Sequence, residues 1–139
     1  MIAAVVSICI VLAAVAIAVA RKTPRKLNPD YFGEAWKEIQ NRCKDKGSWS
    51  DAIVEADKLL DRALKRRKFK GRSMGERMVS AQRKFTNNDG LWFAHNLYKK
   101  ILVDPDLKLR EADVKEALVG YRQALRDLGA LQSVESRSS

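Results

Sequence analysis

The chain begins with an unbroken apolar run and then changes to apolar and charged residues that alternate at helical spacing. Its first twenty residues contain no Asp, Glu, Lys or Arg. As a helix rising about 1.5 Å per residue, such a run would just cross a hydrocarbon core of about 30 Å. The pattern predicts a transmembrane helix over residues 1–20, followed by a basic juxtamembrane linker over residues 21–27.

A cleaved signal peptide is the alternative interpretation of this run, because Ala18-Val19-Ala20 resembles a small-residue cleavage site. However, no basic residue precedes the run, and the run is longer than the apolar core of a usual signal peptide. Four basic residues follow it at once and oppose export of the downstream chain: Arg21, Lys22, Arg25 and Lys26. By the positive-inside rule we expect a single-pass protein of the cell membrane, with the N-terminus outside and the helical domain in the cytoplasm.

Residues 28–131 carry apolar residues at intervals of three and four, which is the spacing of amphipathic helices. Asn28 and Pro29 predict the start of one helix, which should end near Gly47. The next helix has the most regular apolar face, and Gly71 is expected to end it. That face consists of Trp49, Ala52, Ile53, Ala56, Leu59, Leu60, Ala63 and Leu64.

Three further helices are predicted before the polar tail. A capping box at Ser73 begins a short helix that should reach Phe85. The next covers residues 91–103, before Pro105, and the last runs from about residue 110 to Gly129, its candidate C-cap.

No segment of the sequence shows sustained strand alternation. We therefore expect an all-α protein: a transmembrane helix, then a compact bundle of four or five helices over residues 28–131. Residues 132–139 read as a disordered tail.

Charge divides the chain in the same place as the hydrophobic pattern. The 139 residues include 27 basic and 17 acidic side chains, and the net charge of +10 belongs entirely to residues 21–139. One cysteine, Cys9, lies in the apolar run and the other, Cys43, lies in the domain. An intrachain disulfide would have to join the two parts, so a reducing compartment is the simpler interpretation.

Six basic residues lie within eight positions at the end of the second predicted helix of the domain. They are Lys65, Arg66, Arg67, Lys68, Lys70 and Arg72. The helix macrodipole accounts for two or three of them, and a solvated helix end is the simplest interpretation. The functional alternatives are contact with anionic lipid headgroups, at about 1 kcal/mol per basic residue, or contact with nucleic-acid phosphates. Only Phe69 is interleaved with these charges, which disfavours base stacking.

The sequence contains no supported catalytic, metal-binding or cofactor-binding pattern. His95 is the only histidine, and on a half-buried helix face we expect a hydrogen-bonded structural residue. Cys43 lies on an apolar face, where a thiol is usually inert packing. We therefore expect a protein that is not an enzyme.

Residues 91–131 carry a resemblance to known proteins in the segments AHNLYKKILVDPD and LKLREADVKEALVGYRQALRDLGAL. This region resembles the C-terminal part of uncharacterised single-span helical proteins of candidate-phylum bacteria, in which a helix of the form AH-x-LRN-x-I-x-HE precedes a final Lys/Ala/Leu-rich helix. That helix is in turn similar to the HEPN helical bundles, many of which cleave RNA with an arginine and a histidine. The matching arginine, asparagine and histidine positions hold Tyr98, Lys99 and Val103 here. The resemblance implies the fold without the ribonuclease chemistry, since valine cannot transfer a proton.

These observations lead to one expected function and two alternatives. We expect a membrane-anchored helical bundle that acts by binding either a protein partner or the anionic membrane surface, through the two basic clusters. The alternatives are a nucleic-acid-binding protein at the membrane and a catalytically inactive relative of the HEPN ribonucleases. The sequence leaves the partner and the oligomeric state open.

Overall fold

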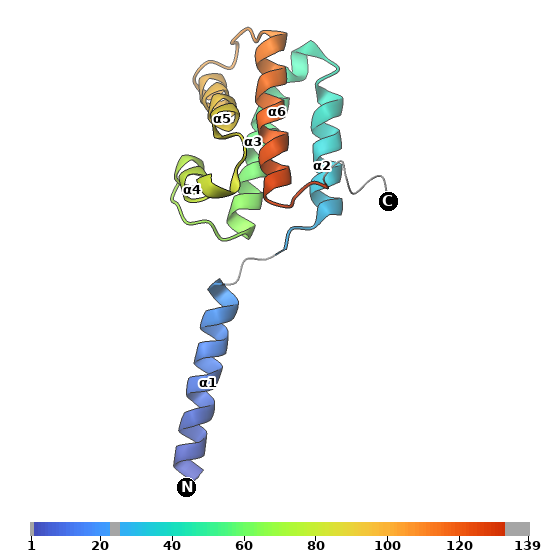
Figure 1. Ribbon diagram of the computed structural model, residues 1–139. Coiled ribbons are helices and arrows are strands. Elements are labelled where there is room, and N and C mark those ends of the chain that lie inside the picture. Colours follow the sequence, from blue (N-terminus) through green and yellow to red (C-terminus); the bar gives the residue numbers. More distant parts are fainter. Residues whose placement is uncertain (1, 23–25, 133–139) are drawn as a thin grey trace.

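The structure is a computed structural model in which helices are joined by short loops (Figure 1). It describes residues 2–22 and 26–132, and in the first range it describes the side chains of residues 5–17. The described residues form α1 (Ile2–Lys22), α2 (Pro29–Arg42), η1 (Lys46–Ser48), α3 (Trp49–Arg66), α4 (Met74–Ser80), η2 (Gln82–Lys84), α5 (Asn88–Val103) and α6 (Glu111–Asp127), where η marks a 3₁₀ segment. The predictions of an all-helical chain and of a helical bundle are confirmed for this part of the chain.

Polar side chains cap the helix starts that the sequence predicts. The Asn28 side chain accepts a hydrogen bond from the Asp30 N–H at 3.0 Å, and Pro29 occupies the first turn of α2. The Ser73 hydroxyl accepts one from the Glu76 N–H at 3.2 Å at the start of α4. These bonds satisfy backbone donors that have no partner within the helix.

Three predicted helix ends are wrong, and the first is that α2 ends at Arg42 and not near Gly47. α3 ends at Arg66 and not at Gly71, because Lys68 adopts the left-handed conformation with φ 61° and turns the chain out of the helix. α4 ends at Ser80 and not at Phe85. Phe85 is buried as its apolar character predicts, but it reaches the core from extended backbone.

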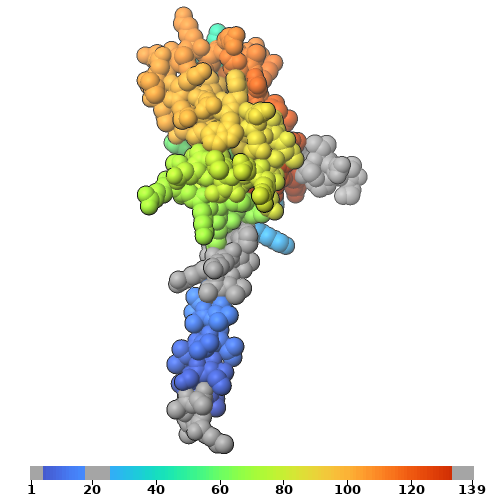
Figure 2. Space-filling model, turned by 60° about the vertical axis from the view of Figure 1, so that its left-hand side comes forward, coloured from blue at the N-terminus to red at the C-terminus, as the bar shows by residue number. Residues whose placement is uncertain are grey.

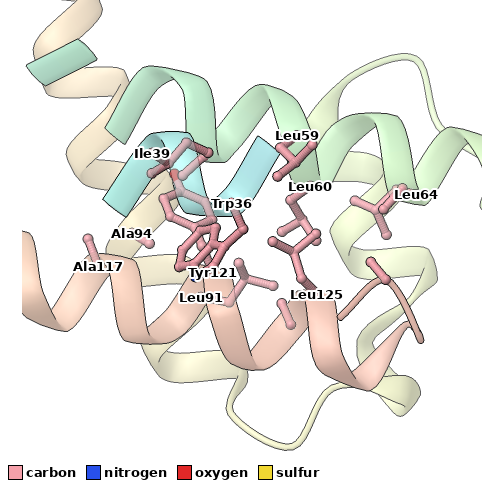
Figure 3. Close-up of a cluster of buried hydrophobic side chains, with 14 of the residues drawn as sticks. Trp36, Ile39, Leu59, Leu60, Leu64, Leu91, Ala94, Ala117, Tyr121 and Leu125 are labelled. Atoms are coloured by element: carbon pink, nitrogen blue, oxygen red, sulfur yellow. The ribbon is translucent and has the colours of Figure 1, made fainter. Parts of the chain in front are cut away.

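α3 packs against α2, α4, α5 and α6, and the hydrophobic core surrounds it. The apolar face predicted for this helix is buried from Ala52 to Leu64, and Trp49 at its start is partly buried. Figure 3 shows side chains of four helices meeting in one cluster, among them Trp36, Leu60, Leu91 and Leu125. Burial of each large apolar side chain contributes about 1.5–3 kcal/mol, so this cluster supplies much of the stability of the bundle.

α1 lies apart from the bundle (Figure 1). Its described large side chains are exposed, from 51% at Val6 to 65% at Ile10. The first residue of the hydrophobic core is Leu27, which is 7% exposed.

The prediction of a transmembrane helix over residues 1–20 is corrected by the structure. Within the part of the chain that the structure describes, no helix combines the length and the apolar character needed to cross a membrane. The predictions of a single-pass protein and of a cell-membrane location, with the N-terminus outside and the domain cytoplasmic, are wrong on the same finding.

Candidate functional site

The basic cluster on α3 surrounds the point where that helix ends. The Phe69 N–H donates to the Leu64 carbonyl at 3.1 Å, and the Lys68 N–H donates to the Lys65 carbonyl at 3.0 Å. With Lys68 left-handed, this is the hydrogen-bond pattern of a Schellman motif. The motif reverses the chain, so the basic residues after it fold back beside the last turn of the helix.

Lys65 and Arg67 have partners within the fold. The Lys65 ammonium lies 3.3 Å from the Asp61 carboxylate. The Arg67 guanidinium donates to the Leu128 carbonyl at 2.6 Å, at the C-terminal end of α6. A cation at this end of a helix also complements the macrodipole, so Arg67 joins α3 to α6.

Of the other members, Lys68 is partly buried. Arg66, Lys70 and Arg72 are all exposed. None of them forms an ion pair with a described residue. The nearby acids are occupied: Asp61 by Lys65 and Arg77, and the Glu76 carboxylate by the Arg72 backbone N–H at 2.5 Å. We call Arg66, Lys70 and Arg72 the basic end of the bundle.

The second predicted cluster can be placed only in part. Lys26 is exposed, in the segment that leads into α2. Figure 1 shows that this segment and the loop between α3 and α4 lie at the same end of the bundle, and Figure 2 shows the green surface of α3 and α4 at that end. The side chains of Arg21 and Lys22, and Arg25 as a whole, lie outside the described residues. The prediction that both clusters contact a membrane surface or a polyanion is therefore untested.

The aromatic residue within the basic cluster does not form a stacking platform. Phe69 is partly buried and packs against the hydrophobic core. A ring held in this way offers little face to an unpaired base, so the arrangement favours charge contacts over base stacking.

A buried polar cluster joins three helices at the centre of the bundle. His95 Nδ1 lies 2.8 Å from Asp57 Oδ2, and the Tyr121 hydroxyl donates to the same oxygen at 2.7 Å. The exposed fractions of Asp57, His95 and Tyr121 are 3%, 6% and 0%. The hydrogen bond expected for His95 is present. Because all three side chains are enclosed, the cluster orients α3, α5 and α6 and is closed to substrate-sized molecules.

Aromatic rings enclose His95 further. The Tyr98 ring stacks on the imidazole at 5.7 Å between centroids, and Trp92 meets it edge-on at 6.0 Å. Burial and the negative charges of Asp57 and Asp61 raise the pKa of Tyr98, and burial together with Asp57 raises the pKa of Tyr121. Both phenols therefore remain protonated donors at neutral pH.

A second ion pair lies one helical turn further along α3. Arg77 donates to both oxygens of Asp61, at 2.6 and 3.0 Å, and to the Gly71 carbonyl at 2.9 Å. Arg77 is 8% exposed. This bidentate contact fixes α4 on α3 and holds the loop that carries the basic end.

The role of Asp57 was not predicted from the sequence. A signal was present, because Asp57 follows Ile53 by four residues and precedes Leu60 by three, and so lies on the apolar face. A carboxylate on a buried face needs partners. Its partners are 38 and 64 residues away and cannot be read from local spacing.

The positions that match the HEPN motif are arranged without catalytic geometry. Tyr98 stacks on His95, Lys99 is exposed, and Val103 at the end of α5 is 88% exposed. Burial raises the pKa of the Cys43 thiol, whose Sγ donates to the Ile39 carbonyl at 3.2 Å. Among the described residues, no group of three or more His, Cys, Asp or Glu side chains could hold a metal ion.

Comparison with known proteins adds no relative to this picture. No family model matches the chain, and no curated protein or solved structure matches it. The resemblance to single-span proteins of candidate-phylum bacteria and to HEPN bundles stays a prediction.

Proposed function

We propose that this chain is a non-enzymatic binding protein whose basic end receives an anionic macromolecule. The observation that carries the proposal is that Arg66, Lys70 and Arg72 are exposed and form no ion pair with a described residue, while the acids beside them, Asp61 and Glu76, have other partners. Unpaired charges close together attract an opposite charge more strongly than the same charges spread over the surface.

Rigidity of the loop supports the same function. The loop is fixed by the Arg77–Asp61 pair, and the Ser80 hydroxyl donates to the Lys70 carbonyl at 2.6 Å. A preorganised set of charges loses less conformational entropy on binding than a mobile tail of the same composition. This distinguishes the basic end from an ordinary solvated helix end.

The test replaces the three charges together and measures binding over a range of salt concentration. The full-length chain and the triple variant Arg66→Gln/Lys70→Gln/Arg72→Gln are titrated with polyglutamate, single-stranded RNA and anionic vesicles. For RNA, each lost phosphate contact makes the salt slope shallower by about 0.7, so loss of three contacts should reduce it by about two. The control variant Lys99→Gln/Lys100→Gln/Lys108→Gln removes the same charge from exposed positions elsewhere.

We expect the control variant to bind like the unmodified chain and the triple variant to lose most of its affinity. An equal loss in both variants would show attraction to net charge without a site, and would contradict the proposal. The class of polyanion that is bound most tightly at physiological salt identifies the partner class.

A further inference from the structure

A groove runs between α2 and α6, which both pack on α3. Its volume is about 540 Å³, within the range of about 300–1,000 Å³ that is usual for ligand sites. Gly33, Trp36 and Lys37 line it from α2, and Arg122 and Arg126 line it from α6.

Two buried N–H donors beside this groove have no acceptor in the described part of the chain. One is the indole Nε1–H of Trp36, a residue that is 6% exposed, and the other is the Nε–H of Arg126. The indole of Trp49, in contrast, donates to the Cys43 carbonyl at 2.9 Å. An unsatisfied buried donor is destabilising, so both groups favour a ligand that brings an acceptor.

The charges around the groove favour a single carboxylate group over a dianionic group. Lys37, Arg122 and Arg126 contribute three cations, and none of them forms an ion pair with a described residue. Asp30 and Glu34 also line the groove and would repel a dianionic phosphate more than a single carboxylate. Arginine pairs with a carboxylate through two parallel hydrogen bonds.

The aromatic residue of the groove argues against a nucleic acid as the ligand. The Trp36 side chain is part of the hydrophobic core. The ring face is therefore covered, and a base could not stack on it. Only the indole N–H is left to interact with a ligand.

We propose that the groove between α2 and α6 binds an acidic peptide segment of a partner protein, with one carboxylate received by the Trp36 indole N–H and the Arg126 guanidinium. The proposal rests on the proposed function and names its partner class. The groove begins beside Pro29, at the end of the bundle where the loop of the basic end also lies. An acidic segment longer than the groove can contact both.

The test uses the indole N–H signals of the full-length chain in nitrogen-15 NMR spectra. The probe is a blocked hexaglutamate peptide, with hexaglutamine and inorganic phosphate as comparison ligands. We expect hexaglutamate to move the Trp36 indole proton downfield, because it gains an acceptor, and to leave the Trp49 indole unchanged, because it already has one. A Trp36→Phe variant assigns the signal.

Two variants with a matched control locate the ligand. A Cβ atom at Gly33 would meet no atom within 4 Å, so Gly33→Leu fills the groove without a clash at its first atom and should abolish the Trp36 shift while the unfolding temperature is maintained. Arg126→Gln should weaken hexaglutamate binding by tenfold or more. Lys115→Gln removes one charge from an exposed position on the same helix and should leave the affinity unchanged.

Three outcomes would overturn the groove proposal. Each can be distinguished from a failure of the basic end to bind an anionic macromolecule. The groove holds only water if the Trp36 signal ignores hexaglutamate at millimolar concentration. It is not selective for carboxylates if phosphate moves the signal equally, and it is not the site if Gly33→Leu leaves the shift intact. If hexaglutamate still binds through Arg66, Lys70 and Arg72 in these cases, the proposed function stands and only the groove proposal is lost.

Discussion

At the scale of single residues, Asp57 shows how burial makes a charged side chain dependent on its partners. Its Oδ2 atom receives the Tyr121 hydroxyl and faces His95 Nδ1. Removing one partner of a buried carboxylate leaves desolvated charge without compensation, which is costly. The three residues therefore act as one unit in stability.

Tyr121 gives the bundle a sensitivity to alkaline pH. Burial and Asp57 raise the pKa of this phenol above its unfolded value of about 10. The folded state thus holds the proton more tightly, so this contribution to stability is complete below pH 10 and is lost as the pH rises above it. We expect the free energy of unfolding to fall by about 1.4 kcal/mol per pH unit from this group above pH 10, measured by urea unfolding between pH 8 and 11.

The matched variants for this prediction are Tyr121→Phe and Tyr31→Phe. Tyr121→Phe should cost about 1–3 kcal/mol at pH 7, because Asp57 loses a donor, and its stability should fall less steeply above pH 10. Tyr31 is 44% exposed, and its replacement should leave the alkaline fall intact. An unchanged slope in Tyr121→Phe would refute the assignment.

Lys68 offers a second test at this scale. It has φ 61° at the end of α3, where the equivalent position of α6 is Gly129 with φ 82°. Glycine adopts this conformation without steric cost and alanine does not. We expect Lys68→Gly to be about 1 kcal/mol more stable than Lys68→Ala in chemical unfolding. Both variants lose the lysine side chain. Equal free energies of unfolding would therefore show that the left-handed conformation at residue 68 has no steric cost for alanine.

At the scale of elements, glycines show where two helices approach closely. A Cβ atom at Gly120 in α6 would lie 2.5 Å from the Gly90 carbonyl oxygen in α5. A contact with backbone cannot be relieved by a side-chain rotation, so the two helices would have to move apart. The packing of α5 on α6 requires glycine here.

Alanine at two helical glycines should therefore have opposite effects. Gly120→Ala should lower the free energy of unfolding by about 1–3 kcal/mol through overpacking. Gly33→Ala in α2 meets open space and should raise it by about 0.5–1 kcal/mol through better helix propensity. Thermal unfolding of both variants measures the difference, and a stabilising Gly120→Ala would mean that the helices are less closely packed than described.

Helix starts were more predictable than helix ends, for a physical reason. Asn28 and Ser73 cap their helices through side chains within three residues, so the local sequence contains the whole interaction. The end of α3 depends on a left-handed lysine, which has no recognisable sequence signal, and Gly71 was the wrong choice. The end of α4 is set by Phe85, which reaches the core by leaving the helix.

At the scale of the whole molecule, the bundle is stabilised without α1. The described side chains of α1 are exposed, and the core begins at Leu27. Deletion of residues 1–25 should leave the free energy of unfolding within about 0.5 kcal/mol of the full-length value, since truncation costs follow the burial that is lost. Deletion of residues 1–28 also removes Leu27 and the Asn28 cap, and should cost more. A large decrease in the free energy of unfolding on deletion of residues 1–25 would reveal contacts between α1 and the bundle.

The sequence was enough to predict that the chain is helical, where most of its helices begin, and which face of α3 is buried. These properties depend on residues within one or two turns of each other, so spacing and capping residues are enough to predict them. The sequence also located the run of six basic residues, but charge alone could not separate Lys65 and Arg67, which have partners in the fold, from Arg66, Lys70 and Arg72.

The side chains that meet across the bundle could be identified only from the folded chain. Asp57, His95 and Tyr121 come together because three helices cross there, and the groove exists because α2 and α6 pack on α3 with space between them. The apolar pattern of residues 1–20 predicted a transmembrane helix, which the structure contradicts. Hydropathy reports the composition of a segment, whereas partners, cavities and unpaired donors depend on contacts between residues that are distant in the chain.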